Sequence, residues 1–585
     1  MMATVAMRYS ALILFAAMLC GCSADRSRQP FVSLAEEFVY TTLAWSPVSA
    51  TQVGLHKHGE LRLDAILDDF SPNAIEQQRN WLNDIRLRLL RAADLQTLSA
   101  EDRADFDIIQ DQIALSLHEI NTVQSYRHNP TIYVELIGNG LYAPSVLEYA
   151  PKAERCRHIV SRMRGVSALL AQARRNLTDS PEIWNEVAQD ENDGNIGLVE
   201  STLREACSSE VGAADYDAAA KPAVEALRGF STWLREDLSQ RRSDWRLGAE
   251  KYAAKFRYAL ATDATPDHVL AAAEQDMRDT RRQMLALART MPGAETSGDE
   301  HEVIAGALSK VAANHATRET YFEAARRDLA EVRAFVKDKD LLTLPPRDNL
   351  QVIETPEFMR GIYSVGGFNS APAFEPHLGA FYWLTPIPAT WPAARVESKL
   401  REYNTFGLKL LTIHEAMPGH YVQLEYANDV QPPLRRILRS VFGNGPYVEG
   451  WAVYATEAML DSGYLNNDPG LRLTFLKQQL RVFANTVLDV RLHTKGMTDS
   501  QAMDLMLEGA FQENEEAQGK LRRAKLSSVQ LPTYYVGWRD WHRVRERYRE
   551  AHSGMVNLKE FHERALREGA LPLPVLSRLI AGKAL

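Results

Sequence analysis

The chain has 585 residues, of which 45% are hydrophobic and 24% are charged, and its formal net charge is −9. This composition is ordinary for a folded protein with a sizeable core, and the mild acidity excludes the basic surface that nucleic-acid binders need. The length allows two to four domains or one large helical domain.

The N-terminus has the pattern of an export signal with a lipid attachment site. Arg8 precedes an apolar run at 11–19, and Leu-Cys-Gly-Cys follows at 19–22. The run is too short to cross a bilayer comfortably, and the four residues resemble a bacterial lipobox. We therefore expect 1–21 to be a signal peptide, Cys22 to carry lipid and 22–32 to be a tether. A plain signal peptide or a buried apolar strand is the alternative.

The expected location follows from this lipid anchor. The protein would be periplasmic and attached to the bacterial envelope through its N-terminal lipid only, with Ser23 after the cysteine favouring the outer membrane. In that compartment, Cys156 and Cys207 either form a disulfide or remain buried free thiols.

Hydrophobic residues at three- and four-residue steps predict helices over most of the chain. We expect helices within 33–120, at 152–178, 213–240, 249–260, 265–290 and about 301–336, and again from about 397 to the end. The segment 341–396 is rich in proline, glycine and aromatic residues, and short strands are expected at Leu350–Glu354 and Gly379–Leu384.

The expected fold is therefore mostly α, with a small β insert at about 345–390 directly before the segment His-Glu-Ala-Met-Pro-Gly-His at 414–420. We expect residues 33–585 to form one helical domain, with its site between helical halves. A strand beside the site would hold an extended peptide by backbone pairing.

The segment at 414–420 has the ligand types of a zinc site in an unusual spacing. His414 and His420 are six residues apart, which on a continuous helix is about 240° of net rotation, so they would face away from each other. Pro418 breaks a helix and Gly419 tolerates unusual backbone conformations. Together they would loop out the extra residues and bring His420 back beside His414.

A third ligand is expected from the helical stretch that begins with Tyr447-Val-Glu. Glu449 and Glu457 are eight residues apart and share a helix face. We expect Glu449 to be the third ligand and Glu457 to orient a ligand histidine from outside the coordination sphere.

These motifs resemble the DUF885 family, which is similar by its motifs to the gluzincin metallopeptidases. The resemblance covers nearly the whole mature chain, and the first two motifs are the most specific. The matching segments are HEAMPGHYVQ (414–423), VEGWAVYATE (448–457), LDVRLHTKGMT (488–498), LPTYYVG (531–537), FHERALREGALPLPVL (561–576) and SPVSATQVGLHKHGELRLDAILDD (46–69).

The resemblance implies a metallopeptidase-like helical domain, the metal site at 414–457, and roles for individual residues. His414, His420 and Glu449 look like ligands of one zinc ion, and Glu415 looks like the general base. The Asp489-x-x-x-His493 pair would support the site or contact substrate, so His493 is a catalytic candidate and Asp489 a supporting one. Arg491, which departs from the family pattern, is a candidate carboxylate anchor. Tyr534 is the candidate oxyanion donor, and Tyr535 is the alternative donor and a candidate substrate-binding residue.

Some residues have two readings from the sequence. Phe381, Tyr382 and Trp383 are either core or a substrate platform, and Tyr382 is kept as a substrate-binding candidate. Arg522 and Arg523 either bind a peptide carboxylate or, with more weight, belong to a solvated basic face.

The expected function is zinc-dependent hydrolysis of peptides in the cell envelope, with Glu415 activating a water molecule. Two alternatives remain open: a noncatalytic peptide-binding or scaffold lipoprotein with a structural metal, and a metal-dependent amidase acting on a non-peptide amide. The sequence does not fix the oligomeric state, the peptide or the cleavage position.

Overall fold

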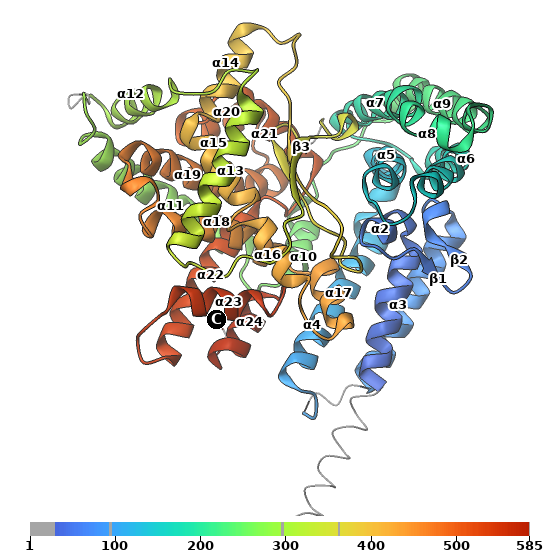
Figure 1. Ribbon diagram of the computed structural model, residues 1–585, viewed down its shortest axis with the longest axis horizontal. Helices are drawn as coiled ribbons and strands as arrows, with labels where there is room; N and C mark the ends of the chain where they lie inside the picture. The colour runs from blue at the N-terminus through green and yellow to red at the C-terminus, as the bar shows by residue number, and fades with distance from the viewer. Residues whose placement is uncertain (1–29, 93–95, 294–297, 361–362, 584) are drawn as a thin grey trace, which may run out of the picture.

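A computed structural model describes residues 30–92, 96–293, 298–360, 363–583 and 585 (Figure 1). The predicted signal peptide at 1–21, Cys22 and most of the tether at 22–32 lie outside the described residues. Among the described helices, none is long and apolar enough to cross a membrane.

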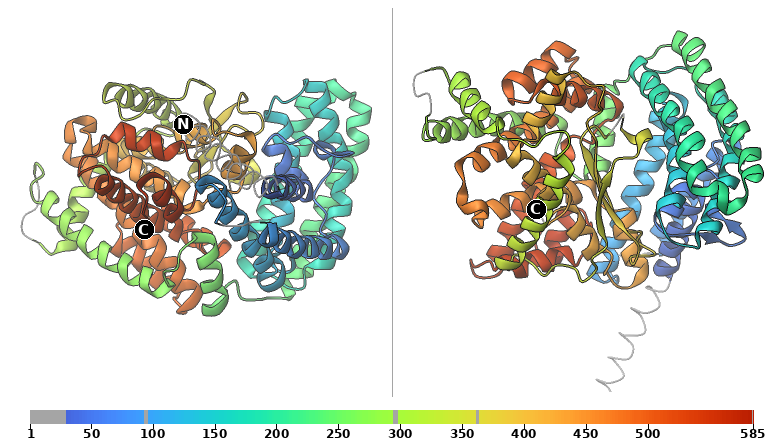
Figure 2. Two further views of the ribbon diagram at one scale, coloured as in Figure 1. Left: turned by 90° about the horizontal axis from the view of Figure 1, so that it is seen from below. Right: turned by 45° about the horizontal axis from the view of Figure 1, so that its top comes forward.

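The helices form an N-terminal and a C-terminal group, which lie on opposite sides of the molecule in Figures 1 and 2. The N-terminal group contains residues 30–45, α2 Pro47–Gln52, α3 Pro72–Ala92, α4 Ala100–His118, α5 Thr131–Val146, α6 Lys152–Asn176, α7 Glu182–Gly197, α8 Leu203–Val211 and α9 Ala213–Glu236. A disulfide between Cys156 and Cys207 joins α6 to α8, with Cα atoms 5.4 Å apart.

The C-terminal group contains the remaining helices. They are α10 Gly248–Leu260, α11 Pro266–Ala288, α12 Glu300–Ala312, α13 Tyr321–Asp338, α14 Ala393–Glu402, α15 Thr405–Glu415, α16 His420–Ala427, α17 Pro433–Val441, α18 Gly445–Asp461, α19 Pro469–Thr494, α20 Asp499–Asp504, α21 Asn514–Leu526, α22 Pro532–Ala551, α23 Leu558–Leu566 and α24 Leu573–Ala581. The mostly α fold is therefore confirmed.

The expected helix at about 301–336 is two helices, α12 and α13. Between them Thr317 and Thr320 exchange side-chain and backbone hydrogen bonds, including Thr317 N to Thr320 Oγ1 at 2.9 Å. Such local bonds compete with the helical pattern and close a turn. Helices α5, α7 and α8, which the hydrophobic spacing did not predict, complete the N-terminal group.

The insert before the metal segment is a three-stranded sheet in the order β3-β5-β4. Strands β3 (Leu350–Glu354) and β5 (Ala380–Leu384) are parallel, and β4 (Gly366–Asn369) is antiparallel to β5. Both predicted strands are thus present, and β4 is an addition. A two-stranded hairpin of β1 (Lys57–His58) and β2 (Leu61–Arg62) lies in the N-terminal group.

The aromatic residues of β5 belong to the core. All five residues of the strand are buried, and the Tyr382 side chain is fully enclosed with its hydroxyl 3.4 Å from Thr412 Oγ1 on α15. The interpretation of Tyr382 as a substrate-binding residue is therefore wrong. The run is apolar because both faces of this central strand are covered.

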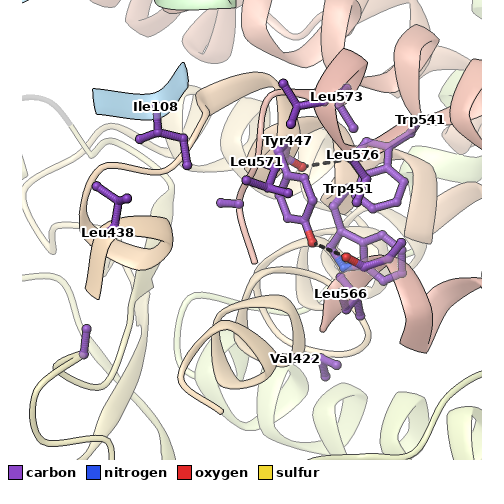
Figure 3. Close-up of a cluster of buried hydrophobic side chains, with 14 of the residues drawn as sticks. Ile108, Val422, Leu438, Tyr447, Trp451, Trp541, Leu566, Leu571, Leu573 and Leu576 are labelled. Atoms are coloured by element: carbon purple, nitrogen blue, oxygen red, sulfur yellow. Dashed lines mark hydrogen bonds between the residues drawn. The ribbon is translucent and has the colours of Figure 1, made fainter. Parts of the chain in front are cut away.

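Helices α18 and α22 cross in close contact at two glycines. A Cβ built on Gly450 would lie 2.3 Å from the carbonyl carbon of Gly537. Beside this crossing, Tyr447, Trp451 and Trp541 pack together (Figure 3), and the Trp541 indole donates to the Tyr447 carbonyl at 2.9 Å. The crossing fixes the position of α22 relative to α18.

Candidate metal centre

The segment 414–420 loops out of the helix as its sequence predicts. Helix α15 ends at Glu415, the Met417–Pro418 bond is cis, and α16 begins at His420. The backbone of Gly419 closes on α15, with its N–H donating to the Ile413 carbonyl at 3.0 Å. A Cβ at Gly419 would lie 1.9 Å from the His414 carbonyl oxygen, so only glycine fits there.

This loop brings the three candidate ligands together. The ligand atoms of His414, His420 and Glu449 all lie within 4.8 Å of one another. Glu449 Oε2 is 3.6 Å from His414 Nε2 and 3.4 Å from His420 Nε2, and the two imidazole rings lie edge to face. Two ligands bound to one tetrahedral zinc at about 2.05 Å would be roughly 3.3 Å apart, which is close to both distances.

The electrostatics of the centre also fit a metal ion. Glu449 Oε2 and His420 Nδ1 are buried without a hydrogen-bond partner. Burial alone would raise the pKa of Glu449, but the two neighbouring histidines hold it far below its ordinary value. Burial works to lower the pKa of His420, but Glu449 outweighs it and raises that pKa. A buried carboxylate oxygen facing two imidazole nitrogens is the donor set that zinc prefers.

Capping and a buried indole hold the ligand helices in place. Asn404 accepts hydrogen bonds from Phe406 N and Gly407 N at the start of α15, and Asn444 caps α18 in the same way. On α18, the Trp451 indole donates to the Pro418 carbonyl at 2.9 Å. Helix α18 therefore carries one candidate ligand and anchors the loop between the other two candidates.

A cavity of about 140 Å³ opens next to the ligands, and His414, Glu415 and Tyr534 line it. Glu415 is only 9% exposed. All lining residues come from 365–534, so the cavity lies inside the C-terminal helix group and not between the two groups.

Tyr534 and Tyr535 have different surroundings. The Tyr534 ring stacks beside His414 with centroids 6.3 Å apart, and its hydroxyl accepts from Gln530 at 3.4 Å and Arg523 at 3.5 Å. Burial raises the pKa of Tyr534 to about 12, so its hydroxyl stays protonated at neutral pH. Tyr535 is fully buried and donates to Asp276 at 2.7 Å. Tyr535 is therefore a core residue and not a substrate-binding one.

The Asp489–His493 pair lies outside the cavity and supports its wall. Asp489 Oδ2 accepts from Tyr252 and from Val529 N, both at 2.8 Å, and His493 Nε2 lies 3.0 Å from the Ser527 carbonyl. The pair holds the loop that leads into α22 and Tyr534. The assignment of His493 as a catalytic residue is therefore wrong, because its ring is enclosed among these groups.

Two further expected roles are contradicted. Arg491 is half exposed and pairs with Glu274 at 2.6 Å, so it is not a carboxylate anchor in the cavity. Glu457 accepts from Trp538 at 2.7 Å and lies 2.9 Å from His542 Nε2, so it ties α18 to α22 and does not orient a ligand histidine. Glu457 is eight residues, or about two helical turns, beyond Glu449 on α18 and is not part of the cluster of three candidate ligands.

The sequence did not predict that basic residues line the cavity. Arg523 lines the cavity, whereas its neighbour Arg522 is on the surface and pairs with Asp190. Arg481 and Lys520 also line it and were not singled out. Only their position on α19 and α21, which the hydrophobic pattern does not specify, distinguishes them from other basic residues.

Comparison with known proteins matches the chain to a family whose function is not known. The family model described as "Bacterial protein of unknown function (DUF885)" matches residues 47–580. No curated protein matches the chain. Among solved structures, a candidate lipoprotein of unknown function from Shewanella oneidensis is 30% identical, with a TM-score of 0.77 over 94% of this chain and 99% of that one. A candidate lipoprotein from Colwellia psychrerythraea is 19% identical, with a TM-score of 0.77 over 95% and 98% of the two chains, and shares the fold.

Proposed function

The chain belongs to the DUF885 family, and from the geometry of its metal centre we propose that it is a zinc-dependent peptidase of the cell envelope. The observation that carries the proposal is that one cavity brings together a set of candidate metal ligands and two groups suited to catalysis. His414, His420 and Glu449 are positioned to hold one ion, and Glu415 and Tyr534 line the space beside them. A structural metal site has no use for a carboxylate base and a phenol donor at its open side.

A zinc ion held there would supply a Lewis acid and a water molecule with a pKa near 7. Glu415 accepts a proton from the attacking water and later gives it to the leaving amine. The protonated hydroxyl of Tyr534 donates to the oxyanion that forms at the scissile carbonyl, and Arg523 and Gln530 hold that hydroxyl in place. One such donor is worth roughly 3 kcal/mol in the transition state.

The sheet offers a way to hold the peptide backbone. Among the described strands, β4 pairs only with β5, so its other edge is open. Val365 and Gly366, at the start of β4, line the cavity. An extended peptide added to this edge would run past Glu415 with its carbonyl groups fixed by backbone hydrogen bonds.

The proposed location is the periplasm, with a lipid on Cys22 and attachment to the outer membrane. Three observations support it: the lipobox-like segment at 19–22, the 30% identity to a candidate lipoprotein and the disulfide between Cys156 and Cys207. Disulfides persist in the oxidising periplasm and are rare in the cytosol.

The experiment compares the chain that begins at residue 23 with its Glu415→Gln variant. Metal content is measured by mass spectrometry, and cleavage is measured on a mixed peptide pool. We expect about one zinc ion in each protein and cleavage by the wild type only, because glutamine keeps the shape of Glu415 but cannot take a proton. Two zinc-loaded proteins that both leave every peptide intact would contradict the proposal.

A further inference from the structure

Helix α21 presents two cations to the cavity that have no carboxylate partner. Lys520 is 6% exposed and lines the cavity, and its ammonium group forms no ion pair with the described residues. The guanidinium of Arg523 contacts the neutral side chains of Gln530 and Tyr534. Neither cation forms an ion pair with the described residues, and the carboxylates that influence them, Glu516 and Glu449, lie beyond ion-pair distance.

The other basic residues nearby are paired. On the outer face of α21, Arg522 pairs with Asp190 at 2.5 Å and Lys525 with Asp499 at 2.6 Å. Within the cavity, Arg481 pairs with Glu516 at 2.5 Å. Lys520 and Arg523 are thus exceptions on a helix whose other cations find acidic partners.

An unpaired cation in a buried wall is unfavourable, because it loses water and gains no opposite charge. The cost shows at Lys520, where burial, Arg481 and Arg523 lower the pKa well below its ordinary value and Glu516 and Glu449 only partly oppose the shift. A bound anion would remove this cost. Guanidinium and ammonium groups make their strongest hydrogen bonds with carboxylates and phosphates.

The size and lining of the cavity limit what that anion can be attached to. A cavity of about 150 Å³ holds a molecule the size of benzene, so about 140 Å³ leaves room for one side chain. Its remaining walls combine an apolar part, with Leu410, Val453, Phe475 and Val482, and polar side chains that include Thr456, Gln479 and Asn485. A single apolar residue with a carboxylate fits this space better than a longer segment does.

We propose that Lys520 and Arg523 bind the free C-terminal carboxylate of the peptide, so that the protein removes single apolar residues from the C-terminus. This inference rests on the proposed peptidase function. In the reaction, water adds its hydroxyl to the last peptide carbonyl, the C–N bond breaks and the amine of the released amino acid takes the proton. Arg523 also touches Tyr534, so binding of the carboxylate and placement of the oxyanion donor share one side chain.

The test uses two peptides of one sequence on the wild-type zinc protein. One ends in leucine as a free acid and the other in leucinamide. We expect release of free leucine from the acid at least 100-fold faster than cleavage of the amide. Equal cleavage of both, or internal cleavage alone, would overturn the inference and leave the peptidase proposal standing. Absence of cleavage of these and of all pool peptides would overturn both.

Variants test the residues themselves. Lys520→Gln should raise KM for the acid more than 10-fold with unchanged zinc content, and should reduce the ratio of the acid rate to the amide rate. Arg522→Gln, two residues away on the outer face, is the matched control and should behave as wild type. Calorimetry on Glu415→Gln adds a readout without turnover, in which the acid should bind at least 10-fold more tightly than the amide. Equal binding of the two peptides would contradict the assignment.

Discussion

Replacing Gly537 by alanine tests whether the α18–α22 crossing positions Tyr534. A Cβ at Gly537 would lie 2.0 Å from the Pro446 carbonyl oxygen and 2.7 Å from Gly450 Cα. Ordinary contacts begin near 3.4 Å, so the helices must separate by roughly 1.4 Å at this point. Tyr534 is one turn before Gly537 and would move with α22.

The expected magnitude follows from this displacement. A shift of about 1 Å in a reacting group costs roughly 100-fold in rate, so kcat/KM should fall about 100-fold. Overpacking costs about 1–3 kcal/mol, and the better helix propensity of alanine offsets about 1 kcal/mol of it. Zinc content should stay at the wild-type level, because the hydrogen bond from Trp451 to the Pro418 carbonyl ties α18 to the loop with the other two ligands, so that α22 should take up the displacement.

The assay measures peptide cleavage, zinc content and thermal unfolding on the same preparation. Gly306→Ala is the control, since a Cβ there meets nothing within 4 Å and the residue also lies inside a helix, α12. The control should keep full activity and be as stable as wild type or slightly more so. Wild-type activity in Gly537→Ala would refute the reasoning, as would loss of zinc together with activity.

Other predictions concern the loop, the tyrosines, the acid stability and the disulfide. Trp451→Phe leaves the buried Pro418 carbonyl without its donor, so we expect a loss of about 1–3 kcal/mol and weaker zinc binding in a chelator competition. Tyr534→Phe should lower kcat about 100-fold with zinc retained, whereas Tyr535→Phe should not slow turnover comparably. Burial lowers the pKa of His562 to about 4, so the unfolded chain binds more protons below pH 6.5 and stability falls as the pH drops from 6.5 towards 4. The loss between pH 7 and pH 5 should be roughly 2 kcal/mol, and His562→Gln should flatten this part of the profile in denaturant titrations at those two pH values. Reduction of the disulfide, whose cysteines are 51 residues apart, should cost about 4 kcal/mol and lower the melting temperature, with zinc content unchanged.

The sequence predicted those helices, breaks and strands that are determined by residues close together in the chain. The helix before His414, the break at Pro418 and Gly419, and the strand Leu350–Glu354 all follow from residue types close together in the sequence. The loop that returns His420 to His414 follows from Pro418 and Gly419, whereas Glu449 joins them through the packing of α18 against α15 and α16.

Roles that depend on long-range packing were not predictable. Tyr382 and Tyr535 each have a hydroxyl group that could contact a ligand. In the fold the Tyr382 hydroxyl lies near Thr412, 30 residues away, and the Tyr535 hydroxyl donates to Asp276, 259 residues away. Glu457 shares a helix face with Glu449, and its partners Trp538 and His542 lie on α22. The spacing of apolar residues along a helix or strand shows which of its faces is buried, but it does not show which other helix or strand packs against that face.

Helix α21 touches both halves of the molecule at once. Its inner face carries Lys520 and Arg523, while on its outer side the Lys525 carbonyl accepts from the Trp184 indole of α7 at 2.6 Å and Arg522 pairs with Asp190 of α7. A rotation of the N-terminal helices would therefore pull on the helix that carries these cations. By thermodynamic reciprocity, an occupant that fixes α21 also restricts that rotation. Trp184 lies at this contact, and its replacement by phenylalanine would remove the hydrogen bond that links α7 to α21.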